Sequence, residues 1–214
     1  MNHKDCIINI TDDYNNNVST AIFKDLYKCD KYITNYCSSN LKIFHLNIRS
    51  INKHSDELGI FLQNFNYNFD IIVLSETWSN NDVCYDIEGY RKFIKPCKYN
   101  NCGGLIIYFK DNIDVTELKV DILYSNCLHF KSKYESTILY LTAIYSLPNL
   151  CINEFLHNFE QFLQIHKNFE SHIVVNVQIL ENHLHYYGHK YLNVMTLGFI
   201  FLKISIANVN RSLC

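Results

Sequence analysis

The stretch DIIVLSETW, residues 70–78, is the one that decides the fold. Its short continuous apolar run follows Asp70 and is typical of a strand buried on both faces. The segment LKIFHLNI, residues 41–48, predicts an earlier strand. Between the two, Ser55 can cap a helix whose apolar residues recur at helical spacing, at Leu58, Phe61, Leu62 and Phe65. Together these segments predict a β-α-β unit.

In the middle of the chain the sequence pattern changes to short apolar runs separated by turn residues. These runs predict antiparallel strands at GYRKFI (89–94), LIIYFK (105–110), ELKVDILY (117–124), NCLHFKSK (126–133) and STILYLTAIY (136–145). After Pro148 an apolar stripe predicts a second helix, at Ile152, Phe155, Leu156, Phe159, Phe162 and Leu163. There follow a buried strand, HIVVNVQI (172–179), a short helix, KYLNVMTL (190–197), ended by Gly198, and a last strand, FIFLKISI (199–206).

This pattern of elements predicts an α/β fold in which two β-sheets pack against each other with helices outside, a four-layer α/β sandwich whose last strands are missing. Residues 1–40 are polar, Asn-rich and aperiodic, so we expect an N-terminal extension there. We expect residues 41–214 to form one α/β domain, incomplete at its C-terminus. With 48% hydrophobic residues in 214, the chain can bury a core of ordinary size.

The net charge, the cysteine pattern and the apolar segments exclude several classes of protein. The net charge is -2 and the sequence pI is about 6.5, so a broad basic footprint for nucleic acid is excluded. Nine Cys without a C-x-x-C pair favour free thiols, although Cys97 and Cys102 could also be metal ligands. The N-terminus shows no signal-peptide pattern, and the most apolar stretch, residues 197–209, is too short to span a bilayer. We therefore expect an intracellular protein, nuclear or cytoplasmic, neither secreted nor membrane-bound.

Four segments resemble one family in their order and spacing. They are HLNIRSI (45–51), DIIVLSETW (70–78), GGLIIYFK (103–110) and AIYSLPN (143–149), the last followed by a helix and a buried strand. Together they resemble the endonuclease/exonuclease/phosphatase superfamily, specifically the apurinic-endonuclease-like domain that accompanies the reverse transcriptase of non-LTR retrotransposons. The resemblance implies that residues 41–214 are an endonuclease/exonuclease/phosphatase-like domain, incomplete at its C-terminus.

The resemblance implies hydrolysis of a phosphodiester in DNA with a divalent metal, Mg²⁺ or Mn²⁺. Hard oxygen ligands suit such ions. By resemblance Glu76 is the metal ligand, and Asn47 supports that ligand or the phosphate. Tyr145 matches a family tyrosine whose hydroxyl contacts the phosphate. DNA is therefore the implied partner, and nothing in the sequence names a protein partner.

The chain departs from the family where the buried strand should end in Gly-Asp-Phe-Asn. Aligning the apolar run puts Val175, Asn176, Val177 and Gln178 at those positions. The carboxamide of Asn176 cannot replace a carboxylate base, and Gln178 is one methylene longer than the family's Asn. Ser146 stands where the family often has Arg, and the closing Ser-Asp-His motif is absent.

Two functions from different classes remain open. The first is a retrotransposon-type endonuclease domain that is catalytically impaired, and the second is a non-catalytic binding or interaction module that kept the fold. A separate zinc site at His183, His185 and His189, with Glu181 as a fourth ligand, is a further alternative.

Overall fold

The computed structural model describes residues 41–66, 69–79, 85–97, 103–134, 137–146, 152–166, 172–177 and 197–202. One sheet has the strand order β3-β4-β2-β1-β9 and the other the order β5-β6-β7-β8. The strands of the first sheet are β1 (Leu41–Asn47), β2 (Ile71–Ser75), β3 (Tyr90–Lys95), β4 (Leu105–Lys110) and β9 (Leu197–Leu202). Those of the second are β5 (Asp114–Leu118), β6 (Ser125–Tyr134), β7 (Thr137–Ser146) and β8 (His172–Val177). The helices are α2 (Ile51–Asn64) and α3 (Ile152–His166).

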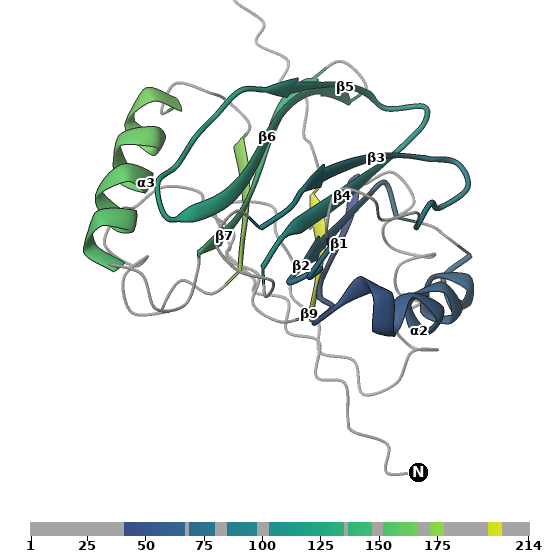
Figure 1. The fold of residues 1–214 in the computed structure, drawn as a ribbon. Helices are drawn as coiled ribbons and strands as arrows, with labels where there is room; N and C mark the ends of the chain where they lie inside the picture. Colours follow the sequence, from purple (N-terminus) through teal and green to yellow (C-terminus); the bar gives the residue numbers. More distant parts are fainter. Residues whose placement is uncertain are drawn as a thin grey trace, which may run out of the picture.

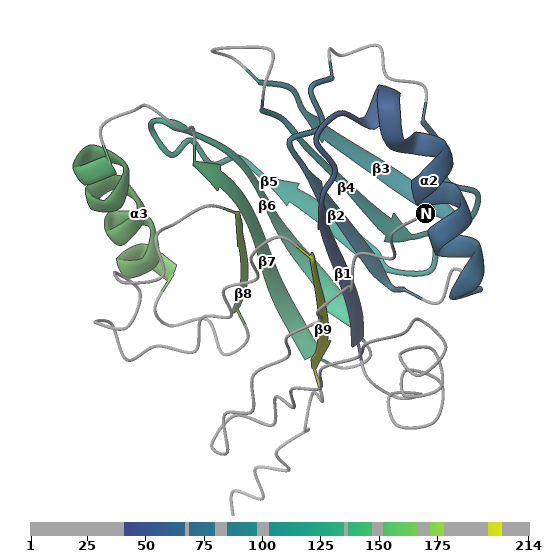
Figure 2. The ribbon, with the colours of Figure 1, turned by 90° about the horizontal axis from the view of Figure 1, so that it is seen from below.

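The two sheets face each other, and one helix covers the outer face of each (Figures 1 and 2). Helix α2 lies against the first sheet and α3 against the second. This confirms the predicted α/β fold of two packed β-sheets flanked by helices. The predicted β-α-β unit is also present, since β1 and β2 pair in parallel with α2 between them in the chain.

An apolar core fills the space between the sheets. It takes alternate residues from facing strands of both sheets, because successive side chains of a strand point to opposite faces. At its centre Phe93 and Phe109 of the first sheet meet Phe130 of the second, with ring centroids 4.8 to 5.8 Å apart. The three rings meet edge to face, an arrangement that aromatic pairs favour. Because this core holds the two sheets against each other, the ends of β1 and β2 lie close to the end of β7.

Helix α2 begins earlier than its sequence pattern predicts. Ser55, the predicted cap, lies inside the helix, which begins at Ile51 after Ser50. Ser50 makes no side-chain capping bond and has a φ of 98°, in the left-handed region. Its N–H instead donates to the carbonyl of Glu76, and its own carbonyl accepts from the N–H groups of Lys53 and His54. Contact with the loop after β2 therefore sets the start of the helix, in place of a local cap.

Two strands also differ from prediction. The run predicted as a strand over 117–124 contributes only its first residues to β5, which starts at Asp114. Ile122 lies outside the sheet and packs against α3. Its burial therefore belongs to the core cluster under α3 and not to a strand of the sheet. At the other end β9 starts at Leu197, which was predicted as the last residue of a helix, and contains Gly198. The rest of that predicted helix, and residues 1–40, lie outside the described residues.

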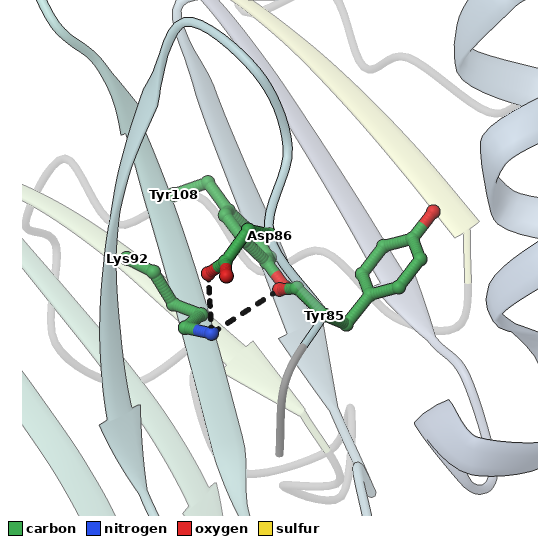
Figure 3. A network of polar contacts seen from close by, with 4 residues as sticks. All are labelled: Tyr85, Asp86, Lys92 and Tyr108. Carbon is green, nitrogen blue, oxygen red and sulfur yellow. Dashed lines mark hydrogen bonds and ion pairs between the residues drawn. The ribbon is translucent and has the colours of Figure 1, made fainter.

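A polar network ties the segment before β3 to the sheet (Figure 3). The Lys92 ammonium contacts Asp86 at 2.6 Å and donates to the carbonyl of Tyr85 at 3.4 Å. The buried Tyr108 hydroxyl donates to the same carbonyl at 2.8 Å. Burial raises the pKa of Tyr108, with smaller contributions from Tyr85 and Asp86. These contacts are structural, since they anchor a loop and leave no group unpaired for a ligand.

Among the described helices, none has the length and apolar character needed to cross a membrane.

Candidate active site

The carboxyl ends of β1 and β2 bring Asn47 and Glu76 to one edge of the first sheet. The two strands are parallel, and Asn47 pairs in register with Ser75, the residue before Glu76. Both side chains are half-buried. The Oδ1 atom of Asn47 is buried and has no hydrogen-bond partner. The sheet therefore presents a carboxylate next to an unpaired amide oxygen.

The loops that follow these strands hold strained backbone conformations. Arg49, Ser50, Glu76 and Trp78 are four of the six non-glycine residues with positive φ in the described part of the chain. The Glu76 conformation, with φ 51°, is held by hydrogen bonds to two neighbouring segments, the residues after β1 and those before β4. Its carbonyl accepts from Ser50, and the next two N–H groups donate to the carbonyls of Gly104 and Gly103. Such strain costs about 1–3 kcal/mol per residue and tends to cluster at functional sites.

The Gly103-Gly104 pair lets β4 approach this loop closely. Gly104 has a φ of 98°, and a Cβ there would lie 2.6 Å from the Thr77 hydroxyl. A Cβ at Gly103 would lie 2.8 Å from the sulfur of Cys97 and 3.0 Å from Nδ2 of Asn126. A side chain at Gly104 would push the Glu76 loop away from β4, and one at Gly103 would clash with Cys97 and Asn126. The close packing around both positions explains the glycine pair of the sequence motif.

Tyr145 reaches the same point from the other sheet. It is the penultimate residue of β7 and only 1% exposed. Its hydroxyl donates a hydrogen bond to Oε1 of Glu76 at 3.3 Å. The structure thus brings together Asn47, Glu76 and Tyr145, the three residues singled out from the sequence motifs, where the two sheets meet.

The pairing of β8 with β7 bears on the missing carboxylate. Asn176 pairs in register with Ile144, whereas Val177 pairs with Tyr145. Position 177, and not 176, is thus opposite the tyrosine of the site. Neither residue has a carboxylate, so a carboxylate base is absent at this point of β8 in either alignment. Gln178 lies outside the described residues, and its predicted role stays a prediction.

Sequence reasoning missed Asn126. This residue of β6 pairs in register with Tyr145 and is 0% exposed. Both Oδ1 and Nδ2 of its carboxamide are buried without a hydrogen-bond partner. No local pattern distinguishes it, because one polar residue at the start of an antiparallel strand looks like a turn residue.

A buried histidine lies beneath the site. His45 is two residues before Asn47 on β1, is fully buried, and has its Nε2 3.3 Å from the Ser75 hydroxyl. Burial lowers the pKa of His45 to about 3. The ring is therefore neutral at pH 7, and it places no positive charge under the Glu76 carboxylate.

The donor atoms at this edge fit a hard divalent cation. Glu76 offers a carboxylate and Asn47 an unpaired oxygen, and Mg²⁺ commonly takes one or two carboxylates and completes its shell with water. No group of three or more His, Cys, Asp or Glu that could hold a metal occurs among the described residues. The predicted zinc ligands, His183, His185, His189 and Glu181, lie outside those residues, as does Cys102.

Comparisons of this chain with known proteins found similarity to solved structures but no match in sequence. No protein-family model matches the chain, and no curated protein matches it in sequence. Among solved structures, the chain is similar to the endonuclease domain of TRAS1, a telomere-specific non-LTR retrotransposon, with 14% identity and a TM-score of 0.48 over 63% of this chain and 57% of that one.

Two other solved structures are similar to the same degree. D. rerio TDP2 complexed with single strand DNA product is 17% identical, with a TM-score of 0.43 over 64% of this chain and 59% of that one. An endonuclease/exonuclease/phosphatase family protein from Bacteroides thetaiotaomicron is 13% identical, with a TM-score of 0.45 over 64% of this chain and 63% of that one. The chain therefore spans less than two thirds of each, and their activities are not transferred to it by similarity.

Proposed function

We propose that this chain is an endonuclease-like domain of the endonuclease/exonuclease/phosphatase superfamily, of the retrotransposon type, that binds a divalent metal and DNA but hydrolyses phosphodiesters weakly. The contact between the Tyr145 hydroxyl and Glu76, beside the unpaired oxygen of Asn47, carries the proposal. It joins residues from three separate motifs at one edge, as a phosphodiesterase site requires.

The chemistry of each group supports this proposal. A divalent cation, Mg²⁺ or Mn²⁺, would supply neutralisation of the phosphate charge when bound by Glu76 and Asn47. The Tyr145 hydroxyl is a donor that can turn from the carboxylate to a phosphate oxygen. Arg49 and Lys53 are exposed near the Glu76 loop, and the Lys53 ammonium lies 6.0 Å from the Trp78 ring centre. They offer local positive charge for DNA in a chain whose net charge is -2.

The weakness of the proposed activity comes from β8. Residues 172–179 contain neither Asp nor Glu, so no carboxylate of that strand can accept a proton from water. A positioned general base typically contributes ~10²–10⁴ in rate. This same observation favours the second candidate function, a binding module that retained the fold and the metal site without the chemistry.

Glu76→Gln should weaken Mn²⁺ binding by at least about tenfold, since it removes the only charged oxygen ligand of the proposed site. Calorimetric titration with Mn²⁺ measures this effect. Glu88→Gln, at an exposed position before β3, is the matched control and should bind Mn²⁺ like the unmodified chain.

A supercoiled-plasmid nicking assay in Mg²⁺ separates the two candidate functions. Slow nicking that disappears in Glu76→Gln supports the impaired endonuclease. Metal binding that depends on Glu76, without nicking, supports the binding module. Equal Mn²⁺ affinity of the unmodified chain and Glu76→Gln would contradict the metal site itself.

A further inference from the structure

Asn126 is a buried carboxamide whose two polar atoms have nothing to bond to within the described part of the protein. Leaving a buried donor or acceptor unpaired costs about 1–3 kcal/mol, so such groups usually have a partner among protein, water or ligand atoms. Because the Asn126 carboxamide has no hydrogen-bond partner among the described residues, it is a candidate for binding a ligand.

The position of Asn126 indicates what that partner is. Asn126 pairs in register with Tyr145 on neighbouring antiparallel strands, so the two side chains lie on the same face, toward the first sheet. Tyr145 contacts Glu76, and Nδ2 of Asn126 lies next to Gly103, whose carbonyl accepts the N–H of Trp78. Asn126 thus borders the Glu76 loop from the side of the second sheet.

The two sheets present groups of different kinds at this edge. The first sheet contributes acceptors, the Glu76 carboxylate and Oδ1 of Asn47. The second contributes donors, the Tyr145 hydroxyl and the amide of Asn126. Oxygen acceptors suit a cation, whereas O–H and N–H donors suit the oxygens of an anion. A phosphate beside a bound cation matches this division.

We propose that Asn126 is a phosphate-binding residue of the candidate site, its amide donating to a phosphate oxygen directly or through one ordered water. This inference rests on the proposed function, because the phosphate would lie next to the metal held by Glu76. The ligand chemistry is a phosphoryl oxygen, which either free phosphate or the backbone of DNA supplies.

The test is Asn126→Leu, which keeps the branched shape of the side chain and removes its polar atoms. Binding of inorganic phosphate is measured by calorimetry in Mg²⁺, and binding of a short labelled DNA duplex by fluorescence anisotropy in Ca²⁺. We expect affinity for both probes to fall about 10- to 100-fold, because a hydrogen bond to a charged group is lost. If only duplex binding falls, the site takes phosphate within DNA; if only phosphate binding falls, it takes the free ion.

Thermal unfolding gives a second readout. Because Asn126→Leu removes an unpaired buried carboxamide, its Tm should equal or exceed that of the unmodified chain. Ser132→Ala is the matched control, since the Ser132 hydroxyl is also buried and unpaired, on the same strand and face but far along β6. It should leave both affinities unchanged. Asn126→Ala, which demands no extra room beside Gly103, replaces Asn126→Leu if that variant unfolds without a cooperative transition.

Unchanged affinity of the Asn126 variants for both probes would overturn this inference, as would failure of the unmodified chain to bind either probe. Mn²⁺ binding separates these failures from that of the proposed function. If Mn²⁺ binding still depends on Glu76, only the role of Asn126 is wrong; if Mn²⁺ does not bind either, the proposed function fails with it.

Discussion

Val177→Asp should raise the rate of plasmid nicking in Mg²⁺ by about 10²- to 10⁴-fold, the usual contribution of a positioned carboxylate base. The reason is the register of β8, in which residue 177 pairs with Tyr145. Directly paired residues of neighbouring strands project from the same face, so an aspartate at 177 is expected to point toward the Glu76 edge. The added carboxylate would also be a further oxygen ligand for the metal.

Asn176→Asp is the matched control for this prediction. Residue 176 pairs with Ile144, which packs with Phe155 and Phe159 of α3. A carboxylate introduced there is expected to meet that apolar layer, which destabilises the fold without helping the reaction. A larger gain in nicking from Asn176→Asp than from Val177→Asp would contradict the register argument and favour the alignment made from sequence.

Metal-dependent stability gives the Val177→Asp experiment a readout independent of turnover. Without metal the new carboxylate faces Glu76 and should lower the Tm, because like charges repel. Added Mg²⁺ should raise the Tm of Val177→Asp more than that of the unmodified chain, since a ligand that binds only the folded state stabilises it in proportion to its affinity. Equal Mg²⁺ effects on the two chains would place residue 177 away from the metal.

The main features of the fold follow from local patterns. The apolar runs of β1 and β2 predict buried strands, and the helix between them predicts that the strands are parallel. Parallel strands end at the same edge of a sheet, so the proximity of Asn47 to Glu76 could be foreseen. Tyr145 follows from the motif resemblance, and the structure supplies the contact that joins it to Glu76.

The features that sequence reasoning missed depend on contacts between distant segments. The register of β8 on β7 is set across a sheet, and a shift of one residue exchanges positions 176 and 177 between its two faces. Ser55 resembles a cap, but the hydrogen bond from Ser50 to the Glu76 loop starts the helix five residues earlier. Asn126 becomes notable only when its neighbours are known to leave it unpaired.

Acid should destabilise this protein strongly through His45. The pKa of its imidazole falls from 6.5 to about 3 on burial, so between those values the unfolded chain binds a proton that the folded chain excludes. The free energy of unfolding therefore decreases as the pH falls below about 6.5, by about 1.4 kcal/mol per pH unit. Because the unfolded imidazole is only half protonated at pH 6.5, the loss between pH 6.5 and 4.5 amounts to about 2 kcal/mol, a substantial share of the ~5–15 kcal/mol typical of a domain.

Urea unfolding at several pH values measures this dependence, with His45→Gln as the test variant. Glutamine can still donate to the Ser75 hydroxyl but does not titrate, so the decrease between pH 6.5 and 4.5 should be smaller by about 2 kcal/mol. His129 is also buried, and burial lowers its pKa to about 4, with a smaller contribution from His166. It remains in both chains, so their difference isolates His45.

His54→Gln is the control, because that side chain bonds Glu57 on the exposed surface of α2, and it should retain the steep dependence. Equal pH dependence in His45→Gln and the unmodified chain would mean that the ring is protonated in the folded state. A cation would then lie two residues from Asn47, where it would repel a divalent metal at Glu76. The neutrality of His45 is therefore a condition for the proposed site as well as a contribution to stability at neutral pH.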